Sequence, residues 1–94
     1  MATSSEYFQY VLELLREVEG ITSRRMMGEY LLYKDGVLFG GVYDNRFLIK
    51  KTEALSPYGL REQIPYPSAK PMFLVDKENP REIKELIDAA LRRD

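Results

Sequence analysis

The sequence of 94 residues contains no cysteine and no histidine. Without cysteine the chain has no disulfide bond, no zinc–thiolate site and no thiol nucleophile. Without histidine it lacks the residue that most often acts as a general base near neutral pH. Carboxylates, lysines, tyrosines and hydroxyls remain, but no pair of them has the spacing and setting of an acid–base site. We therefore predict a protein that is not an enzyme and that has no cofactor or metal ion.

A long apolar run and an excess of basic residues are also missing. No segment approaches the roughly 20 apolar residues that span a membrane, and the first residues lack the pattern of a signal peptide. We therefore expect a cytoplasmic protein without a membrane partner. Fourteen basic residues face fifteen acidic ones, which gives a net charge of −1 at pH 7. A protein that neutralises several phosphates usually carries a basic excess, so this balance disfavours nucleic acid as a partner.

The composition is otherwise that of an ordinary globular chain. Apolar residues make up 45% and charged residues 31% of the sequence, and the length is close to the commonest domain size. There are no repeats, linkers or low-complexity tracts. We predict a single domain over residues 1–94.

Helices are predicted at both ends of the chain. Thr3 and Glu6 have the spacing of a capping box, and apolar residues then recur at helical spacing for about 16 residues, up to Gly20. Gly20 tolerates the left-handed conformation that often follows a helix. Near the other end, Asn79 and Pro80 are a typical N-cap and first helical residue. These signals predict one helix before, and one after, the middle of the chain.

The middle of the chain has the character of a β-sheet. β-branched and aromatic residues dominate from Ile21 to Lys51, and Asp35-Gly36 and Asp44-Asn45 are turn dipeptides. A break at Gly28 could separate the first two strands or interrupt a single one. Gly40-Gly41 within a strand indicates a β-bulge or a close approach of two backbones. The predicted strands form an antiparallel meander over residues 21–27, 29–34, 37–43 and 46–51.

Residues 52–70 are the hardest to interpret. Thr52 to Leu55 could begin a short helix that ends before Pro57 or at Gly59. Pro65 and Pro67 cannot donate to a strand ladder, so a central strand is not expected there. A last strand is predicted over residues 72–75. The predicted fold class is α+β, an antiparallel β-meander on which the N-terminal and C-terminal helices pack.

Both faces of the predicted sheet carry apolar side chains. Tyr30 and Leu32 alternate with Leu31 and Tyr33, and alternation places Phe39 and Tyr43 opposite Leu38 and Val42. A sheet with one face in water alternates apolar and polar residues instead. The second face could be covered by helices or loops of the same chain. Alternatively, a second subunit or a ligand could cover it.

Several spaced segments resemble one known family. They are Arg24 to Tyr30 (RRMMGEY), Leu32 to Gly36 (LYKDG), Phe39, Arg46 to Lys50 (RFLIK), Tyr66, Lys70 to Met72 (KPM) and the closing helix with Ala89 to Leu91. This pattern resembles the TfoX N-terminal domain and extends from about residue 7 to residue 91. Met27 stands where that family usually has phenylalanine, and Glu29 stands where it usually has a second glycine.

The resemblance implies helices packed on an antiparallel sheet, in an arrangement similar to that of secretion chaperones. It also implies a link to the regulation of DNA-uptake competence. Complete regulators of this family carry an additional C-terminal domain, so a chain of this length is expected to be a stand-alone, single-domain member. The family supplies no catalytic residues to transfer.

Three hypotheses of function follow. The first is a non-catalytic regulatory or adaptor protein that binds a protein partner of unknown identity, or forms a homodimer. The second is a nucleic-acid-binding protein that uses a local basic patch of Arg24, Arg25, Lys50 and Lys51. Together with Lys34, Arg46 and Lys70, these residues could converge on the sheet among tyrosines. The third is binding of a small molecule, or catalysis, in a pocket lined by tyrosines. For the first hypothesis the predicted interaction surface consists of Arg24, Arg25, Met27, Gly28, Tyr30, Tyr33 and Lys50.

Overall fold

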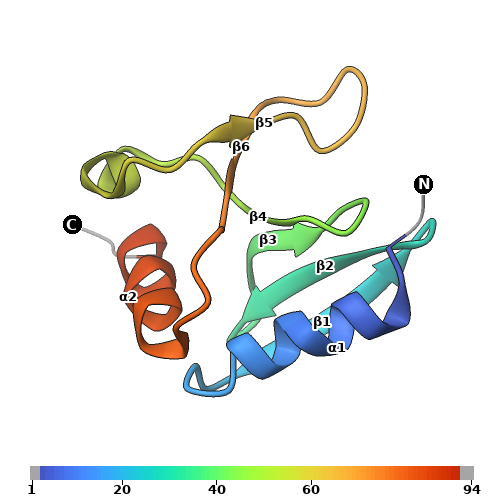
Figure 1. The fold of residues 1–94 in the computed structure, drawn as a ribbon, viewed down its shortest axis with the longest axis horizontal. Helices are drawn as coiled ribbons and strands as arrows, with labels where there is room; N and C mark the ends of the chain where they lie inside the picture. The colour runs from blue at the N-terminus through green and yellow to red at the C-terminus, as the bar shows by residue number, and fades with distance from the viewer. Residues whose placement is uncertain (1–2, 92–94) are drawn as a thin grey trace.

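The computed structural model describes residues 3–91 and has the predicted α+β architecture. The chain forms two helices, one short 3-10 helix and a six-stranded antiparallel sheet (Figure 1). The elements are α1 (Ser5–Leu14), β1 (Ile21–Met26), β2 (Glu29–Lys34), β3 (Val37–Val42), β4 (Phe47–Ile49), η1 (Glu53–Tyr58), β5 (Glu62–Gln63), β6 (Met72–Leu74) and α2 (Pro80–Ala90). No helix in residues 3–91 is long and apolar enough to cross a membrane.

The sheet begins with the predicted meander, because β1, β2, β3 and β4 are neighbours in chain order. The order is β1-β2-β3-β4-β6-β5, so β6 pairs with β4 and the two-residue strand β5 lies at the far edge. Strand β5 was not predicted from the sequence, because it consists of only two residues, Glu62 and Gln63, which are too few to show a strand pattern. The short helix η1 ends at Gly59, whose φ of 63° is left-handed, which is one of the two predicted ends.

Three two-residue turns connect the first four strands. Asp35-Gly36 and Asp44-Asn45 both have positive φ, as the turns of tight hairpins require. Met27-Gly28 has positive φ at both residues as well, between the paired residues Met26 and Glu29. The first two strands are therefore separate, which answers the question that the sequence left open at Gly28. Glu29 itself has ordinary strand geometry.

The start of α1 differs from the predicted capping box. The N-cap is Ser4, whose hydroxyl accepts a hydrogen bond from the Tyr7 N–H at 3.1 Å. Thr3 is buried and binds elsewhere, because its hydroxyl donates to Glu29 Oε1 at 2.8 Å and accepts from the Asn45 N–H at 3.2 Å. A serine one position along from a threonine offers the same capping chemistry, and sequence spacing could not distinguish the two.

Helix α1 also ends about five residues earlier than predicted, at Leu14 rather than next to Gly20. The chain continues in turns, in which the Val18 N–H donates to the Leu15 carbonyl at 2.9 Å and both side chains stay buried. Apolar periodicity therefore persisted beyond the helix and lengthened the prediction. Gly20 does have the predicted positive φ, of 78°, but there it joins the turns to β1. In α2 the predicted Asn79 cap and Pro80 start are both confirmed.

The core lies between one face of the sheet and the two long helices. Strand residues on this face form one apolar cluster with both helices, so we call it the helix face. The cluster contains Phe8, Val11, Leu14, Leu15 and Val18 from the N-terminal segment, Leu32, Phe39, Val42, Phe47, Ile49, Leu55, Phe73 and Val75 from the middle, and Ile83, Leu86, Ile87 and Ala89 from α2. Tyr30 packs against it with its ring stacked on Phe8, at 3.7 Å between ring centroids.

A β-bulge corrects the predicted alternation in β3. Leu32 pairs with Gly40, whereas Tyr33 pairs with Leu38, so Phe39 is an extra residue between two rungs of the ladder. Phe39 therefore shares the helix face with Val42 instead of opposing it, and Leu38 and Tyr43 lie together near the other face. The bulge itself was predicted from Gly40-Gly41. The opposite, non-helical side of the sheet, with Leu31, Leu38 and Leu48, is called the loop face below.

Candidate functional site

The loop face is covered only in part, by the segment that connects β5 to β6. Residues 64–71 of this segment, called the covering loop, pass beside Leu38, Tyr43 and Met72. Leu48 is completely buried although it does not belong to the core of the helix face. Leu31 and Tyr33, which lie closer to the β1 edge, are only half-buried. Thus a loop of the same chain covers one part of the second apolar face. A cover from the same chain was one of the two alternatives that the sequence left open.

Arg46 holds the covering loop in place. Its guanidinium donates to Gln63 Oε1 at 2.9 Å, to the Ile64 carbonyl at 3.2 Å and to the Pro65 carbonyl at 3.0 Å. A fourth hydrogen bond, of 3.2 Å, runs to the carbonyl of Tyr43 in its own turn. The planar fork of an arginine suits several fixed acceptors at once, which a lysine cannot match. Sequence analysis treated Arg46 only as one charge of a basic group, because none of these acceptors leaves a signal in the sequence.

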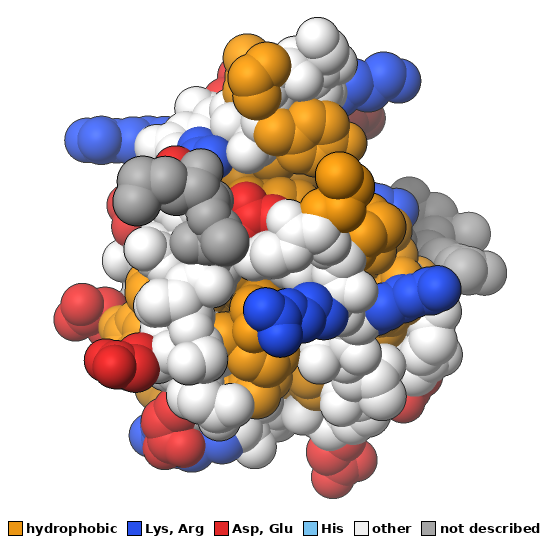
Figure 2. All heavy atoms as spheres, turned by 90° about the vertical axis from the view of Figure 1, so that its right-hand side faces the viewer, with side chains coloured by type: hydrophobic (Ala, Val, Ile, Leu, Met, Phe, Trp, Pro, Cys, Tyr) orange, Lys and Arg blue, Asp and Glu red, His pale blue; other side chains and the backbone are white. Residues whose placement is uncertain are grey.

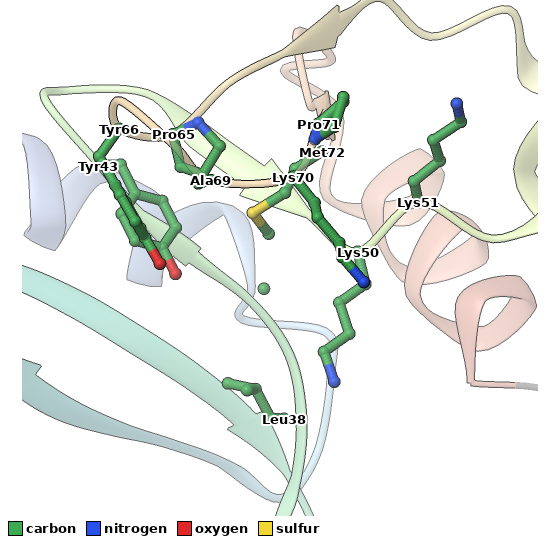
Figure 3. Close-up of a pocket in the computed structure, with 11 residues that line it drawn as sticks. Leu38, Tyr43, Lys50, Lys51, Pro65, Tyr66, Ala69, Lys70, Pro71 and Met72 are labelled. Atoms are coloured by element: carbon green, nitrogen blue, oxygen red, sulfur yellow. The ribbon is translucent and has the colours of Figure 1, made fainter.

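A cavity of about 630 Å³ lies between the covering loop and the loop face (Figure 3). Tyr43 and Tyr66 form one side, with ring centroids 6.2 Å apart, and Figure 3 shows both hydroxyls directed into the same space. Lys50 and Lys70 lie on the opposite side of that space. The rest of the lining consists of Leu38, Gly40, Lys51, Pro65, Ala69, Pro71 and Met72.

Gly41 creates room for the tyrosine side of this cavity. A Cβ atom at residue 41 would lie 2.8 Å from Cε2 of Tyr43 and 2.5 Å from the carbonyl oxygen of Tyr30. The absence of a side chain therefore lets the Tyr43 ring approach the backbone of Gly41 closely. Burial raises the pKa of the Tyr43 hydroxyl above its ordinary value of 10.0, and Tyr66, Glu29 and Tyr33 add to the rise. Tyr43 is thus a neutral hydrogen-bond donor throughout the physiological range.

A second feature is the end of the molecule where three turns meet, which we call the turn end. The N-terminal residue Thr3 binds Gly28 and Glu29, and Ser4 N–H donates to Asn45 Oδ1 at 2.9 Å. Through Arg46 the covering loop joins the same end. Figure 2 views this end, on the right of Figure 1, and shows hydrophobic side chains gathered in its upper part with basic side chains beside them.

Glu29 ties the turn end together. Its Oε1 accepts hydrogen bonds from the backbone N–H and the hydroxyl of Thr3, at 2.9 and 2.8 Å. Its Oε2 accepts from the Asp44 N–H at 3.0 Å. One carboxylate thus connects the N-terminal segment with two hairpin turns. Glu29, one of the two residues at which the sequence departs from the pattern it resembles, thus has a structural role.

Large apolar side chains are exposed at the turn end. Met27 is 96% exposed and Met26 is 52% exposed, while Ile64 and Tyr66 of the covering loop are 54% and 58% exposed. Scattered exposed apolar residues are normal on protein surfaces, but a group at one end can mark a binding surface. Only Met27 and Gly28 of the predicted interaction surface lie at the tip of this end.

The other predicted surface residues are distributed over both faces of the sheet. Arg25 pairs with Tyr30 in the ladder, and its guanidinium lies 6.0 Å from the Tyr30 ring centroid at the edge of the helix face. The neighbouring residue Arg24 and the half-buried Tyr33 alternate onto the loop face. Lys50 borders the cavity. Whether these residues contact a partner stays a prediction.

The basic group considered for nucleic acid is also divided. Arg24 and Arg25 lie on β1 at one edge of the sheet, whereas Lys50 follows β4, three strands away. Lys51 pairs with Glu62 at 2.7 Å. Lys50 and Lys51 do meet Lys70 at the cavity, so this part of the predicted basic group comes together. Among residues 3–91, no three acidic side chains come together in a way that could hold a metal ion.

Comparison with known proteins agrees with this architecture. The sequence model of the TfoX N-terminal domain matches residues 13–92. A protein of Spirochaeta aurantia, described as an uncharacterized 12.7 kDa protein in the trpE 5′ region, is 36% identical over 86 residues, which cover 86% of this chain and 75% of that protein. The chain belongs to the TfoX N-terminal domain family.

Proposed function

We propose that this protein is a regulatory or adaptor protein that binds a protein partner through the turn end and catalyses no reaction. Its family is associated with the regulation of competence, which fits a role in regulation. The exposed side chains of Met26, Met27, Ile64 and Tyr66 supply the apolar centre of the contact surface. Aromatic residues and methionine are enriched in such centres.

The conformation of Met27 is the observation that carries this proposal. Met27 has a φ of 52°, a left-handed conformation that costs a residue with a Cβ atom roughly 1–2 kcal/mol. The two other tight turns use Asp35, Asp44 and Asn45 at their left-handed positions, and such side chains tolerate this conformation. Met27 is also almost fully exposed, so packing against the rest of residues 3–91 offsets little of the cost. Strain that the fold does not need is typical of a functional position.

A variant at this position separates stability from binding. Asparagine favours the left-handed turn conformation, so Met27→Asn is expected to raise the free energy of unfolding by about 1 kcal/mol. The same substitution removes the largest exposed apolar side chain of the turn end. We expect the variant to be more stable than the wild type and to lose its partner.

The experiment is affinity capture from a nuclease-treated lysate of cells that encode the protein. Val37→Asn is the matched control, because Val37 is 42% exposed and lies beside the Asp35-Gly36 turn rather than at the turn end. A protein captured by the wild type and by Val37→Asn, but not by Met27→Asn, supports the proposal. A captured protein that Met27→Asn retains contradicts it.

The same capture tests the alternatives. Arg25→Glu reverses a charge beside the turn end, and we expect it to weaken capture without abolishing it, because rim charges contribute less than central apolar contacts. If nuclease treatment removes everything bound, the function lies in nucleic-acid binding. The oligomeric state, measured by light scattering of the purified protein, tests whether the partner is a second copy of the chain.

A further inference from the structure

We propose that the cavity under the covering loop binds a small organic carboxylate with an apolar, aromatic-sized body. Its volume of about 630 Å³ lies within the range of small-molecule sites, roughly 300–1,000 Å³. Leu38, Ala69 and Met72 offer apolar contacts for the body of the ligand. Tyr66 belongs both to this lining and to the proposed partner surface, but ligand binding needs no partner, because all the lining residues come from the one chain.

The positive charge of the cavity lining indicates that the ligand is an anion. The lining contains three lysines and no carboxylate, although the chain as a whole has a net charge of −1. Glu62 neutralises Lys51 at 2.7 Å. Neither Lys50 nor Lys70 has a carboxylate partner within 4.0 Å among residues 3–91. Two unpaired ammonium groups at one side of a small cavity attract a carboxylate, and the apolar walls strengthen that attraction by lowering the local dielectric constant.

The tyrosine side gives the ligand a second polar contact. No side chain or backbone group in residues 3–91 forms a hydrogen bond with the hydroxyl of Tyr43 or Tyr66, and Figure 3 shows both directed into the cavity. Free hydroxyls can donate to, or accept from, a polar group at the far end of a ligand. Their rings also offer faces for stacking on an aromatic body. A carboxylate near the lysines and a hydroxyl near the tyrosines would satisfy both sides.

Three isosteric probes test the assignment. 4-Hydroxyphenylacetate carries the required anion, 4-hydroxyphenethyl alcohol has the same body without charge, and tyramine carries a positive charge. Ligands of this size bind with Kd values on the order of 1 mM. Backbone amide shifts of the ¹⁵N-labelled chain, followed during titration, report both the affinity and the site. We expect the acid to bind about tenfold more tightly than the alcohol, tyramine to bind most weakly, and the shifts to lie in residues 38–43 and 64–72.

Charge-neutral variants separate the cavity from the rest of the surface. The double variant Lys50→Gln/Lys70→Gln changes two exposed side chains, so it is expected to fold normally and to bind the acid and the alcohol equally. Lys77→Gln/Lys84→Gln makes the same change in net charge away from the cavity and should keep the tenfold preference. Equal binding of acid and alcohol by the wild type would overturn the proposal. So would a preference that survives in Lys50→Gln/Lys70→Gln, or the absence of shifts in residues 38–43 and 64–72 up to about 10 mM ligand.

Discussion

Both faces of the sheet carry apolar side chains, but the two faces are covered in different ways. On the helix face, Leu32, Phe39 and Ile49 are almost completely buried under α1 and α2. On the loop face, Leu48 reaches that degree of burial, whereas Leu31, Tyr33 and Leu38 remain half-buried. The difference shows that apolar alternation identifies which residues face together, whereas the covering element decides whether that face becomes a core or a site.

The covers also differ in what holds them. Each helix contributes apolar side chains, and each one that becomes fully buried stabilises the fold by about 1.5–3 kcal/mol. The covering loop depends on the hydrogen bonds of Arg46, each with a net value of about 0.5–1.5 kcal/mol. We conclude that the helix face provides the stability of the fold, and that the loop face keeps an accessible cavity because its cover is weaker.

The largest expected difference in stability between the two faces is that between alanine variants of the adjacent residues Leu31 and Leu32. Leu32→Ala removes a side chain that is 0% exposed on the helix face and should lower the free energy of unfolding by about 2–5 kcal/mol. Leu31→Ala, one residue away on the loop face, should cost about 1 kcal/mol, because its side chain already contacts water. Urea denaturation of both variants measures the two values, and the shared strand makes each the control of the other. Equal losses would mean that the loop face is as tightly closed as the helix face.

Removal of the Arg46 side chain should have an intermediate effect that stays local. We expect Arg46→Ala to lower the free energy of unfolding by about 1–2 kcal/mol, and to speed hydrogen exchange of the Ala69 and Leu74 amides about tenfold. Arg46→Lys should behave similarly, because a lysine ammonium lacks the planar fork that binds these acceptors at the same time. Arg16→Ala, which removes an exposed, hydrogen-bonded arginine in the turns after α1, is the control and should cost less than about 0.5 kcal/mol. Faster exchange in α1 or α2 would contradict a local role for Arg46.

The smallest expected effect is a change in the stability of the fold at alkaline pH. The pKa of Tyr43 in the folded protein lies above 10.0, so the unfolded chain loses this proton first as the pH rises. The contribution of Tyr43 to stability is therefore complete below pH 10.0 and decreases as the pH rises from there through the folded pKa. Tyr43→Phe should reduce this alkaline loss of stability, as measured by urea denaturation on both sides of pH 10.0.

Tyr7 provides the comparison for the helix face. Burial raises its pKa as well, but a hydrogen bond with the Phe47 backbone acts in the opposite direction. Tyr7→Phe should therefore reduce the alkaline loss less than Tyr43→Phe does. A larger effect of Tyr7→Phe would mean that the Phe47 hydrogen bond does not offset the effect of burial on the pKa of Tyr7.

The sequence predicted the fold well because its signals are local. Asp35-Gly36, Asp44-Asn45 and Asn79-Pro80 fix turns and a helix start through their own backbone preferences, and all are confirmed. Errors occurred where two local patterns are equivalent. Ser4 and Thr3 cap equally well, and an apolar period continues through turns after Leu14 as it would in a helix.

The cavity could not be predicted in the same way, because its parts meet only through long-range contacts. Arg46 reaches Pro65, nineteen residues away, and Lys50 meets Lys70 across the covering loop. Neither relation has a period or a motif. A tyrosine-lined pocket was one of the hypotheses from the sequence, but nothing in the sequence indicated that Tyr43 and Tyr66 would form it.

Native-state hydrogen exchange at increasing urea concentrations tests most directly whether the two covers differ in strength. We predict that amides of the covering loop and β6, such as Ala69 and Leu74, exchange through a local opening with a free energy well below that of global unfolding. Amides on the helix side should exchange by larger openings, for example Leu86 and Ile87 in α2. Amides of β3, such as Val42, should exchange only by global unfolding. If the amides of β6 and β3 exchange with the same free energy and the same urea dependence, the loop face is part of one closed core and the account is wrong.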